Sequence, residues 1–270
     1  MLRGCHLLCT YVCEYRGVNS LLRVSVLGPI ELVVAGGPVR PAGQKQRALL
    51  AALLLEHGKA VSVDRLVDTL WGADPPPTAR AKVHTHVSGL RQALRRCGGD
   101  EEWILTRPPG YLLRTNDVGS DLAEFDGLTA AGRAAAASGD KAAAAEQYAR
   151  ALALWRGPAF ADVTSPVIQA AAAGLDERRV LTIEARAQAN LDVGRCDVAI
   201  ADLSTALTAY PLRERLRGFT MLALYRLGCR ADALRLYRDG YKLLADELGL
   251  EPGPQLRHLH QRILTGDPAL

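Results

Sequence analysis

The sequence predicts a mainly α-helical protein: a winged helix-turn-helix with a small N-terminal antiparallel sheet, followed by an all-α, tetratricopeptide-like domain. Three observations predict this fold. Residues 78–96 have the pattern of an amphipathic helix, and a hairpin pattern follows over residues 103–114. Short alternating stretches and two further helix patterns precede them. The second half repeats a helical pattern at a spacing of 34 residues, which is the tetratricopeptide period.

The positive charge of the chain lies in the first of these domains. The whole chain of 270 residues has a formal net charge of +4. Residues 18–116 contain 13 Lys and Arg against 8 Asp and Glu, whereas residues 117–270 contain 18 against 20. A basic first domain is typical of a protein that meets nucleic acid through that domain.

Residues 1–20 precede the patterned sequence, which begins at Leu21. We expect a disordered leader or a misassigned start, because the features of a signal peptide are weak here. Cys5, Cys9 and Cys13 would align three thiols on a helix, so a metal or redox role stays open. The later cysteines, Cys97, Cys196 and Cys229, show no disulfide framework, and we expect them to be reduced packing residues.

The first domain is expected over residues 21–116. Alternating β-branched residues between 22 and 40, broken by Gly-Pro and Gly-Gly-Pro turns, predict the small antiparallel sheet. Helices are predicted over 43–56 and 62–71, the second with Ser62 as N-cap and Gly72 as its end. Three consecutive prolines at 75–77 then predict an extended linker.

The helix over residues 78–96 organises this domain. Val83, Val87, Leu90 and Leu94 recur at steps of 4, 3 and 4, so they share one face and anchor the helix to a core. Thr78 is expected to cap the helix. The opposite face is cationic and rich in hydrogen-bond donors, and an α-helix with such a face fits the major groove of DNA. An ordinary solvated face is the alternative interpretation.

The second domain, residues 117–270, is predicted to be entirely helical. Gly194 and Gly228 are 34 residues apart, and Ala199 and Ala233 keep the same spacing. Such units are helix–turn–helix pairs that stack and bury a shared face. A looser third unit surrounds residues 138–140, prolines 158 and 166 mark a loop, and a last helix ends near Leu264.

The combination of several short motifs resembles a known family. The motifs are Lys45-Gln-Arg47, Leu70-Trp-Gly72, Pro75-Pro-Pro77, Val87-Ser-x-Leu-Arg91 and Thr106-Arg-Pro-Pro-Gly-Tyr111. They are similar to the OmpR/PhoB-type DNA-binding domain, in particular that of the Streptomyces antibiotic regulatory proteins. The resemblance covers residues 21–270, because the second half resembles the bacterial transcriptional activation domain of that family.

This resemblance implies a DNA-binding transcriptional activator of a secondary-metabolite (antibiotic) cluster. Its partners would be double-stranded DNA carrying direct repeats near a promoter, and RNA polymerase holoenzyme, including the sigma factor and the C-terminal domain of the alpha subunit. A homodimer is expected at least on DNA. The loop between the second and third helices, with Trp71, Pro75, Pro76 and Pro77, would face the polymerase, although the prolines could be only a spacer.

Each candidate DNA-binding residue has an expected partner on the duplex. Lys82, Thr85 and Ser88 are expected at or near the bases, and phosphate contacts are expected from cationic side chains. The phosphate-binding residues would be Lys45, Arg47, Arg91 and Arg95, with Arg80 and His84 also placed on the DNA. Arg107 and Tyr111 of the wing would reach the adjacent minor groove or backbone. Gly89 stands where a basic or larger residue is expected. The glycine either lets the helix backbone approach DNA closely or simply removes a phosphate contact.

The sequence offers little for catalysis or for a cofactor. It has no Gly-x-Ser-x-Gly, Walker A or His-Glu-x-x-His motif. The two His-x-His pairs, at 84 and 86 and at 258 and 260, would diverge by roughly 200° on a helix and chelate a metal poorly. No stretch is long and apolar enough to span a membrane, so we expect a cytoplasmic, nucleoid-associated protein. A tetratricopeptide adaptor without DNA binding and a repressor using the same face are the alternatives.

Overall fold

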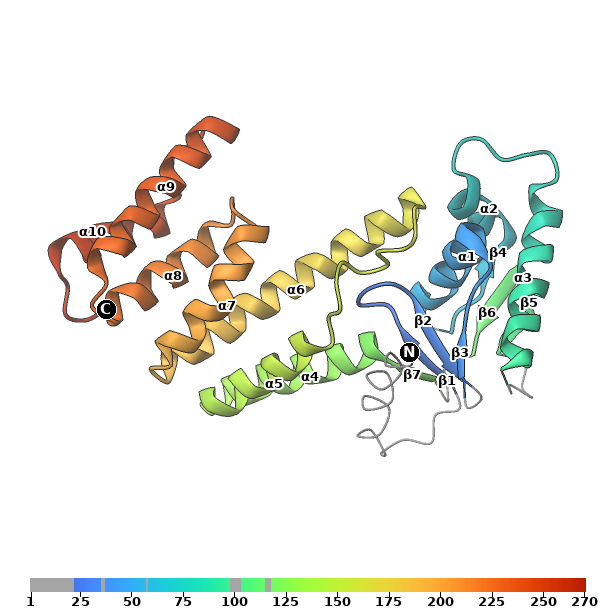
Figure 1. The fold of residues 1–270 in the computed structure, drawn as a ribbon, viewed down its shortest axis with the longest axis horizontal. Helices are drawn as coiled ribbons and strands as arrows, with labels where there is room; N and C mark the ends of the chain where they lie inside the picture. Colours follow the sequence, from blue (N-terminus) through green and yellow to red (C-terminus); the bar gives the residue numbers. More distant parts are fainter. Residues whose placement is uncertain (1–21, 35–36, 57, 98–102, 115–117) are drawn as a thin grey trace, which may run out of the picture. The chain divides into compact units, whose positions relative to one another are not determined.

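The computed structural model describes residues 22–34, 37–56, 58–97, 103–114 and 118–270. The chain divides into two compact units (Figure 1). The first unit contains residues up to Ala123 together with Trp155–Gly174, and the second contains Glu124–Leu154 and Leu175–Leu270. The expected leader and its three cysteines lie outside the described residues. The expected boundary at residue 116 differs from this division, since a segment of the second half folds with the first unit.

Among its described residues, the first unit contains two small sheets, three complete helices and the first residues of α4 and α6. The elements are β1 (Leu22–Ser25), β2 (Glu31–Val34), β3 (Gly37–Val39), α1 (Gly43–Leu55), β4 (Val61–Ser62), α2 (Val63–Trp71), α3 (Ala79–Arg96), β5 (Ile104–Arg107), β6 (Gly110–Leu113) and β7 (Val118–Ser120). One sheet has the order β3-β2-β1-β7, and the other has the order β4-β6-β5. The three helices and the hairpin therefore fall where the sequence predicts them.

Two strands are additions to the predicted set. β7 pairs with β1 in parallel, so the first sheet is not purely antiparallel as expected. β4, only two residues long, pairs with β6 of the hairpin. Neither segment is long enough to show alternation, and both depend on partners distant in sequence.

The helix ends agree with most of the expected caps. The Ser62 hydroxyl accepts a hydrogen bond from the Arg65 amide at 3.2 Å, and α2 ends at Gly72. Thr78 holds the N-cap position of α3, but its side chain makes no capping hydrogen bond. The expectation that Thr78 caps α3 is therefore correct for its position and wrong for its side chain, since its backbone is not in the extended conformation that aims a hydroxyl at the first turn.

The second unit is helical throughout. Its helices are α4 (Asp121–Ala137), α5 (Lys141–Ala153), α6 (Pro166–Asp192), α7 (Cys196–Ala209), α8 (Glu214–Arg226), α9 (Arg230–Leu248) and α10 (Pro254–Thr265). The first residues of α4 and of α6 belong to the first unit. Neighbouring helices pack together as α7 with α8, α8 with α9, and α10 with both α8 and α9.

The spacing of 34 residues has a direct structural counterpart. Gly194 and Gly228 occupy the turns before α7 and α9, with backbone φ of 78° and 80°, a region that residues with a side chain rarely adopt. Ala199 and Ala233, five residues further along, are both fully buried. A turn glycine and a small packing residue thus recur in equivalent helical hairpins. The looser unit is also present, with the Asp140 carboxylate capping α5 through the Ala143 amide.

Candidate nucleic-acid interface

Helix α3 has one buried face and one exposed face. Val83, Val87, Leu90 and Leu94 are at most 3% exposed. Burial of each such side chain contributes roughly 1.5–3 kcal/mol, so this stripe fixes α3 to the core of the first unit. The exposed face consists of Lys82, His84, Thr85, Ser88, Gln92, Arg95 and Arg96. The three side chains expected at the bases, Lys82, Thr85 and Ser88, therefore lie together on one accessible surface.

Arg91 joins this helix to the wing. Its guanidinium donates to the Ile104 carbonyl at 2.9 and 2.7 Å and to the Thr106 hydroxyl at 3.0 Å. The guanidinium also lies 5.7 Å from the centre of the Tyr111 ring. These contacts hold α3 beside β5, as the ribbon in Figure 1 shows. Because its hydrogen bonds are made within the protein, we revise the expected role of Arg91 from phosphate binding to support of the wing.

Tyr111 has the same supporting role. Its side chain is buried, at 5% exposure, and its hydroxyl is hydrogen bonded to Nδ1 of His84. Because the ring packs inward from β6 toward α3, we infer that Tyr111 supports the wing rather than reaching the adjacent minor groove or backbone. His84 is exposed, but its Nδ1 is engaged in this bond. Nε2 is the second ring nitrogen that can form a hydrogen bond. Arg107, at the end of β5 beside the Pro-Pro turn, remains exposed on the wing.

The first turn of α1 contributes one side chain to the same region. Lys45 donates to the Leu70 carbonyl and lies 5.3 Å from the centre of the Trp71 ring. Lys45, Trp71, Lys82, Thr85 and His86 line a small hollow. The hollow brings Lys82 and Thr85 of α3, both predicted to bind DNA, close to Lys45 of α1, which is predicted to bind phosphate. It also contains the indole of Trp71, which was expected to face RNA polymerase. Trp71 is half-buried here.

His86 is a member of this hollow that the sequence interpretation did not select. Its ring lies 6.3 Å from that of Trp71. Burial, and then the positive charges of Lys45 and Lys82, lower the pKa of His86 below its ordinary value. This lowered pKa favours the neutral imidazole over the imidazolium. The signal that could have identified it is its step of 4 from Lys82, which places both side chains on one side of α3.

Two other arginines are paired within the protein. Arg47 Nε lies 3.2 Å from an Asp162 carboxylate oxygen, with 33% of the arginine side chain exposed. We therefore no longer assign Arg47 to phosphate binding in the state that the structure describes. Arg80 pairs with Asp64 at the surface, where both side chains are about two-thirds exposed. Such an exposed pair contributes little stability, so Arg80 can exchange its partner for a phosphate.

Gly89 has a packing role. A Cβ atom built at this position would overlap the side-chain amide of Gln46, which is buried at 8% exposure. Neither expectation for Gly89, a close approach to DNA or the absence of a phosphate contact, accounts for this. The glycine lets α1 and α3 pack closely around Gln46.

The loop between α2 and α3 holds the residues predicted to contact the polymerase. Pro75 and Pro77 are exposed, whereas Pro76 is half-buried and its carbonyl accepts the Ala79 amide at 2.8 Å. The loop is thus fixed at its second end by the start of α3. Its exposed prolines present a surface that loses little conformational freedom on binding a partner.

A helix with a buried stripe and an exposed basic face, followed by a braced hairpin, defines the class of winged-helix transcription regulators. Comparison with known families agrees: residues 40–113 match the family "Transcriptional regulatory protein, C terminal", and residues 120–264 match the "Bacterial transcriptional activator domain". The chain belongs to the Streptomyces antibiotic regulatory protein family of transcriptional activators.

Individual relatives support this membership. The regulatory protein AfsR of Streptomyces coelicolor is 42% identical over 93% of this chain and 25% of its own length. The regulatory protein DnrI of Streptomyces peucetius is 32% identical over 92% of this chain and 94% of its own length. The solved structure of Mycobacterium tuberculosis EmbR with a low-affinity phosphopeptide superposes with a TM-score of 0.85 at 38% identity, covering 92% of this chain and 66% of EmbR.

The chain thus spans about a quarter of AfsR and about two thirds of EmbR. Among the residues described in the structure, no helix is long and apolar enough to cross a bilayer.

Proposed function

We propose that this protein is a sequence-specific DNA-binding activator of a secondary-metabolite cluster. The observation that carries this proposal is the exposed polar and basic face of α3, held by a buried stripe and braced against a wing. Lys82, Thr85 and Ser88 would read base edges, because all three are exposed on α3 and carry hydrogen-bond donors. Arg95 and Arg107, exposed at the end of α3 and on the wing, would hold the flanking phosphates.

The DNA site would consist of tandem direct repeats near a promoter. Two protomers would bind them side by side, with the repeats spaced by about one helical turn, roughly 10–11 bp, so that both lie on one face of the duplex. Lys45 and His86 would line the hollow that receives backbone phosphate. Phosphate contacts would make the affinity strongly dependent on salt.

The α2–α3 loop would contact RNA polymerase holoenzyme. Pro75 and Pro77 support this proposal because they are exposed and belong to a loop that Pro76 ties to α3. Trp71 is better assigned to the hollow, since its ring lies against Lys45 and His86. The expected polymerase surfaces are the sigma factor and the C-terminal domain of the alpha subunit.

The proposal is tested by footprinting and in vitro transcription on the DNA that flanks the gene, with purified holoenzyme. We expect a protected tandem repeat and a rise in transcript. The double variant Pro75→Ala/Pro77→Ala should bind as the wild type does but fail to raise transcription. A protected site with lowered transcription would instead indicate a repressor, and no salt-sensitive binding would favour a protein adaptor.

A further inference from the structure

A segment of the second half completes the fold of the first unit. We call residues 155–165, between α5 and α6, the strap. The Arg156 amide donates to the Leu27 carbonyl at 2.8 Å, and the Phe160 amide donates to the Val26 carbonyl at 3.0 Å. The strap also contributes apolar side chains that are at most 8% exposed. They are Trp155, Ala159, Phe160 and Val163.

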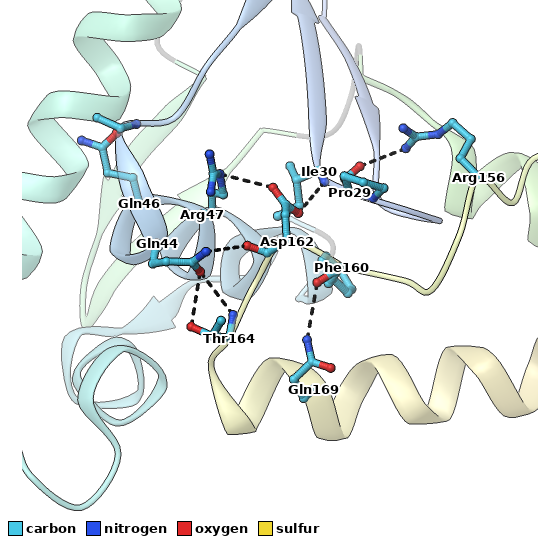
Figure 2. A network of polar contacts seen from close by, with 11 residues as sticks. Pro29, Ile30, Gln44, Gln46, Arg47, Arg156, Phe160, Asp162, Thr164 and Gln169 are labelled. Carbon is cyan, nitrogen blue, oxygen red and sulfur yellow. Dashed lines mark hydrogen bonds and ion pairs between the residues drawn. The ribbon is translucent and has the colours of Figure 1, made fainter.

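The strap holds the first turn of α1 through polar contacts (Figure 2). Asp162 pairs with Arg47 at 3.2 Å and accepts a hydrogen bond from the Ile30 amide at 2.8 Å. The Gln44 side chain donates to the Asp162 carbonyl at 2.9 Å and accepts from the Thr164 amide at 3.2 Å. Asp162 therefore ties the start of α1 to the turn between β1 and β2.

The same turn of α1 packs against α3. Gln46 is buried, accepts the Ala42 amide at 2.7 Å and fills the space beside Gly89. The strap reaches the end of α2 as well, where the Ser165 hydroxyl donates to the Thr69 carbonyl at 2.6 Å. A displacement of the strap would thus reach α3 both through Gln46 and through the end of α2.

We propose that the strap is a coupling element that holds α3 in the position required for DNA binding. The proposal rests on the proposed function for its DNA readout, but not for its structural readout. The strap is continuous with α5, which ends at Ala153, and with α6, which begins at Pro166. An event in the second unit that loosens the strap would therefore weaken DNA binding without touching the DNA-binding face.

The sign of the effect separates coupling from simple charge masking. Replacing Asp162 removes a negative charge and releases Arg47, so an electrostatic effect alone would strengthen the binding of DNA. Loss of the contacts between the strap and α1 would instead weaken the binding of DNA. For Asp162→Ala in the full-length chain we expect the Kd for promoter DNA to rise roughly threefold to tenfold, which corresponds to the loss of one ordinary intramolecular hydrogen bond.

Hydrogen exchange gives a readout that does not depend on DNA. In Asp162→Ala, backbone amides in the first turn of α1 and in α3 should exchange faster than in the wild type. Glu146→Gln is the matched control, since Glu146 is an exposed carboxylate on α5 shortly before the strap. This control should leave both exchange in α3 and the Kd unchanged.

A second variant keeps the test decisive if Asp162→Ala does not fold. Gln44 is exposed, so Gln44→Ala should remain folded, and it should change α3 exchange and the Kd in the same direction by a smaller factor. Unchanged exchange in α3 in both variants would overturn the proposal, as would tighter DNA binding by either. If the wild type binds no DNA, the proposed function fails, and the exchange comparison still decides the role of the strap.

Discussion

Arg91 allows a sharp distinction between a residue that contacts DNA and one that shapes the DNA-binding surface. Its guanidinium makes three hydrogen bonds to β5. Bonds to a charged group contribute about 1.5–3 kcal/mol each when buried, and this side chain is only half-buried. With allowance for solvent, Arg91→Ala should lower the free energy of unfolding of the first unit by about 2 kcal/mol, and Arg91→Lys by about 1 kcal/mol, because lysine keeps the charge but not the planar fork.

Tryptophan fluorescence in a urea titration measures this change selectively. All three tryptophans of the chain, at positions 71, 103 and 155, belong to the first unit. The buried Trp103 lies next to the strand that Arg91 contacts. A shift of the unfolding midpoint therefore reports on the unit that contains the wing.

Arg95→Ala provides the opposite expectation. Arg95 is exposed on the same helix, so its loss should change stability by less than about 0.5 kcal/mol. It should instead lower the slope of log affinity against log salt by about 0.9, the value for one phosphate that is no longer neutralised. If Arg91→Ala leaves the unfolding midpoint unchanged and flattens the salt dependence as Arg95→Ala does, then Arg91 binds phosphate and the role assigned to it is wrong.

Three further predictions concern single side chains. Tyr111→Phe removes the hydroxyl bonded to His84 and should cost about 1 kcal/mol in a urea titration, with little change in the salt dependence of DNA binding. Because the pKa of His86 is lowered in the folded protein, the unfolded chain binds more protons than the folded chain as the pH falls through the ordinary histidine pKa of about 6.5. The free energy of unfolding should therefore decrease as the pH drops through that value. The variant His86→Gln should lose less stability than the wild type between about pH 7.5 and 5.5, as measured by urea titrations at the two pH values. Gly218 in α8 has room for a methyl group, with leucine atoms no closer than 3.7 Å, so Gly218→Ala should stabilise the second unit by roughly 0.5–1 kcal/mol in calorimetry; a loss of stability would show that α8 is constrained there.

The sequence was sufficient for features that depend on local pattern. The stripe of Val83, Val87 and Leu90 predicted both the extent of α3 and its buried face, and the spacing of Gly194 and Gly228 predicted the helical hairpins. These features depend on helical periodicity and turn geometry, which neighbouring residues determine.

Features that depend on distant partners could not be predicted in this way. Tyr111 and Arg91 carry groups that suit DNA as well as they suit a neighbouring strand, and only the packing of β5 and β6 against α3 decides between these roles. Asp162 is a single carboxylate in a loop, 115 residues from Arg47, and no sequence periodicity joins the two. The same limit explains why β4 and β7 were not expected.

The central claim is that the exposed face of α3 reads a DNA sequence. Its most direct test compares a footprinted duplex with a scrambled duplex of equal length in anisotropy titrations, for the wild type and for the triple variant Lys82→Ala/Thr85→Ala/Ser88→Ala. We expect the triple variant to lose most of the preference for the footprinted duplex, at about 1–3 kcal/mol for each base that is no longer read, while salt-dependent binding to the scrambled duplex persists. An unchanged preference in the triple variant would contradict the claim.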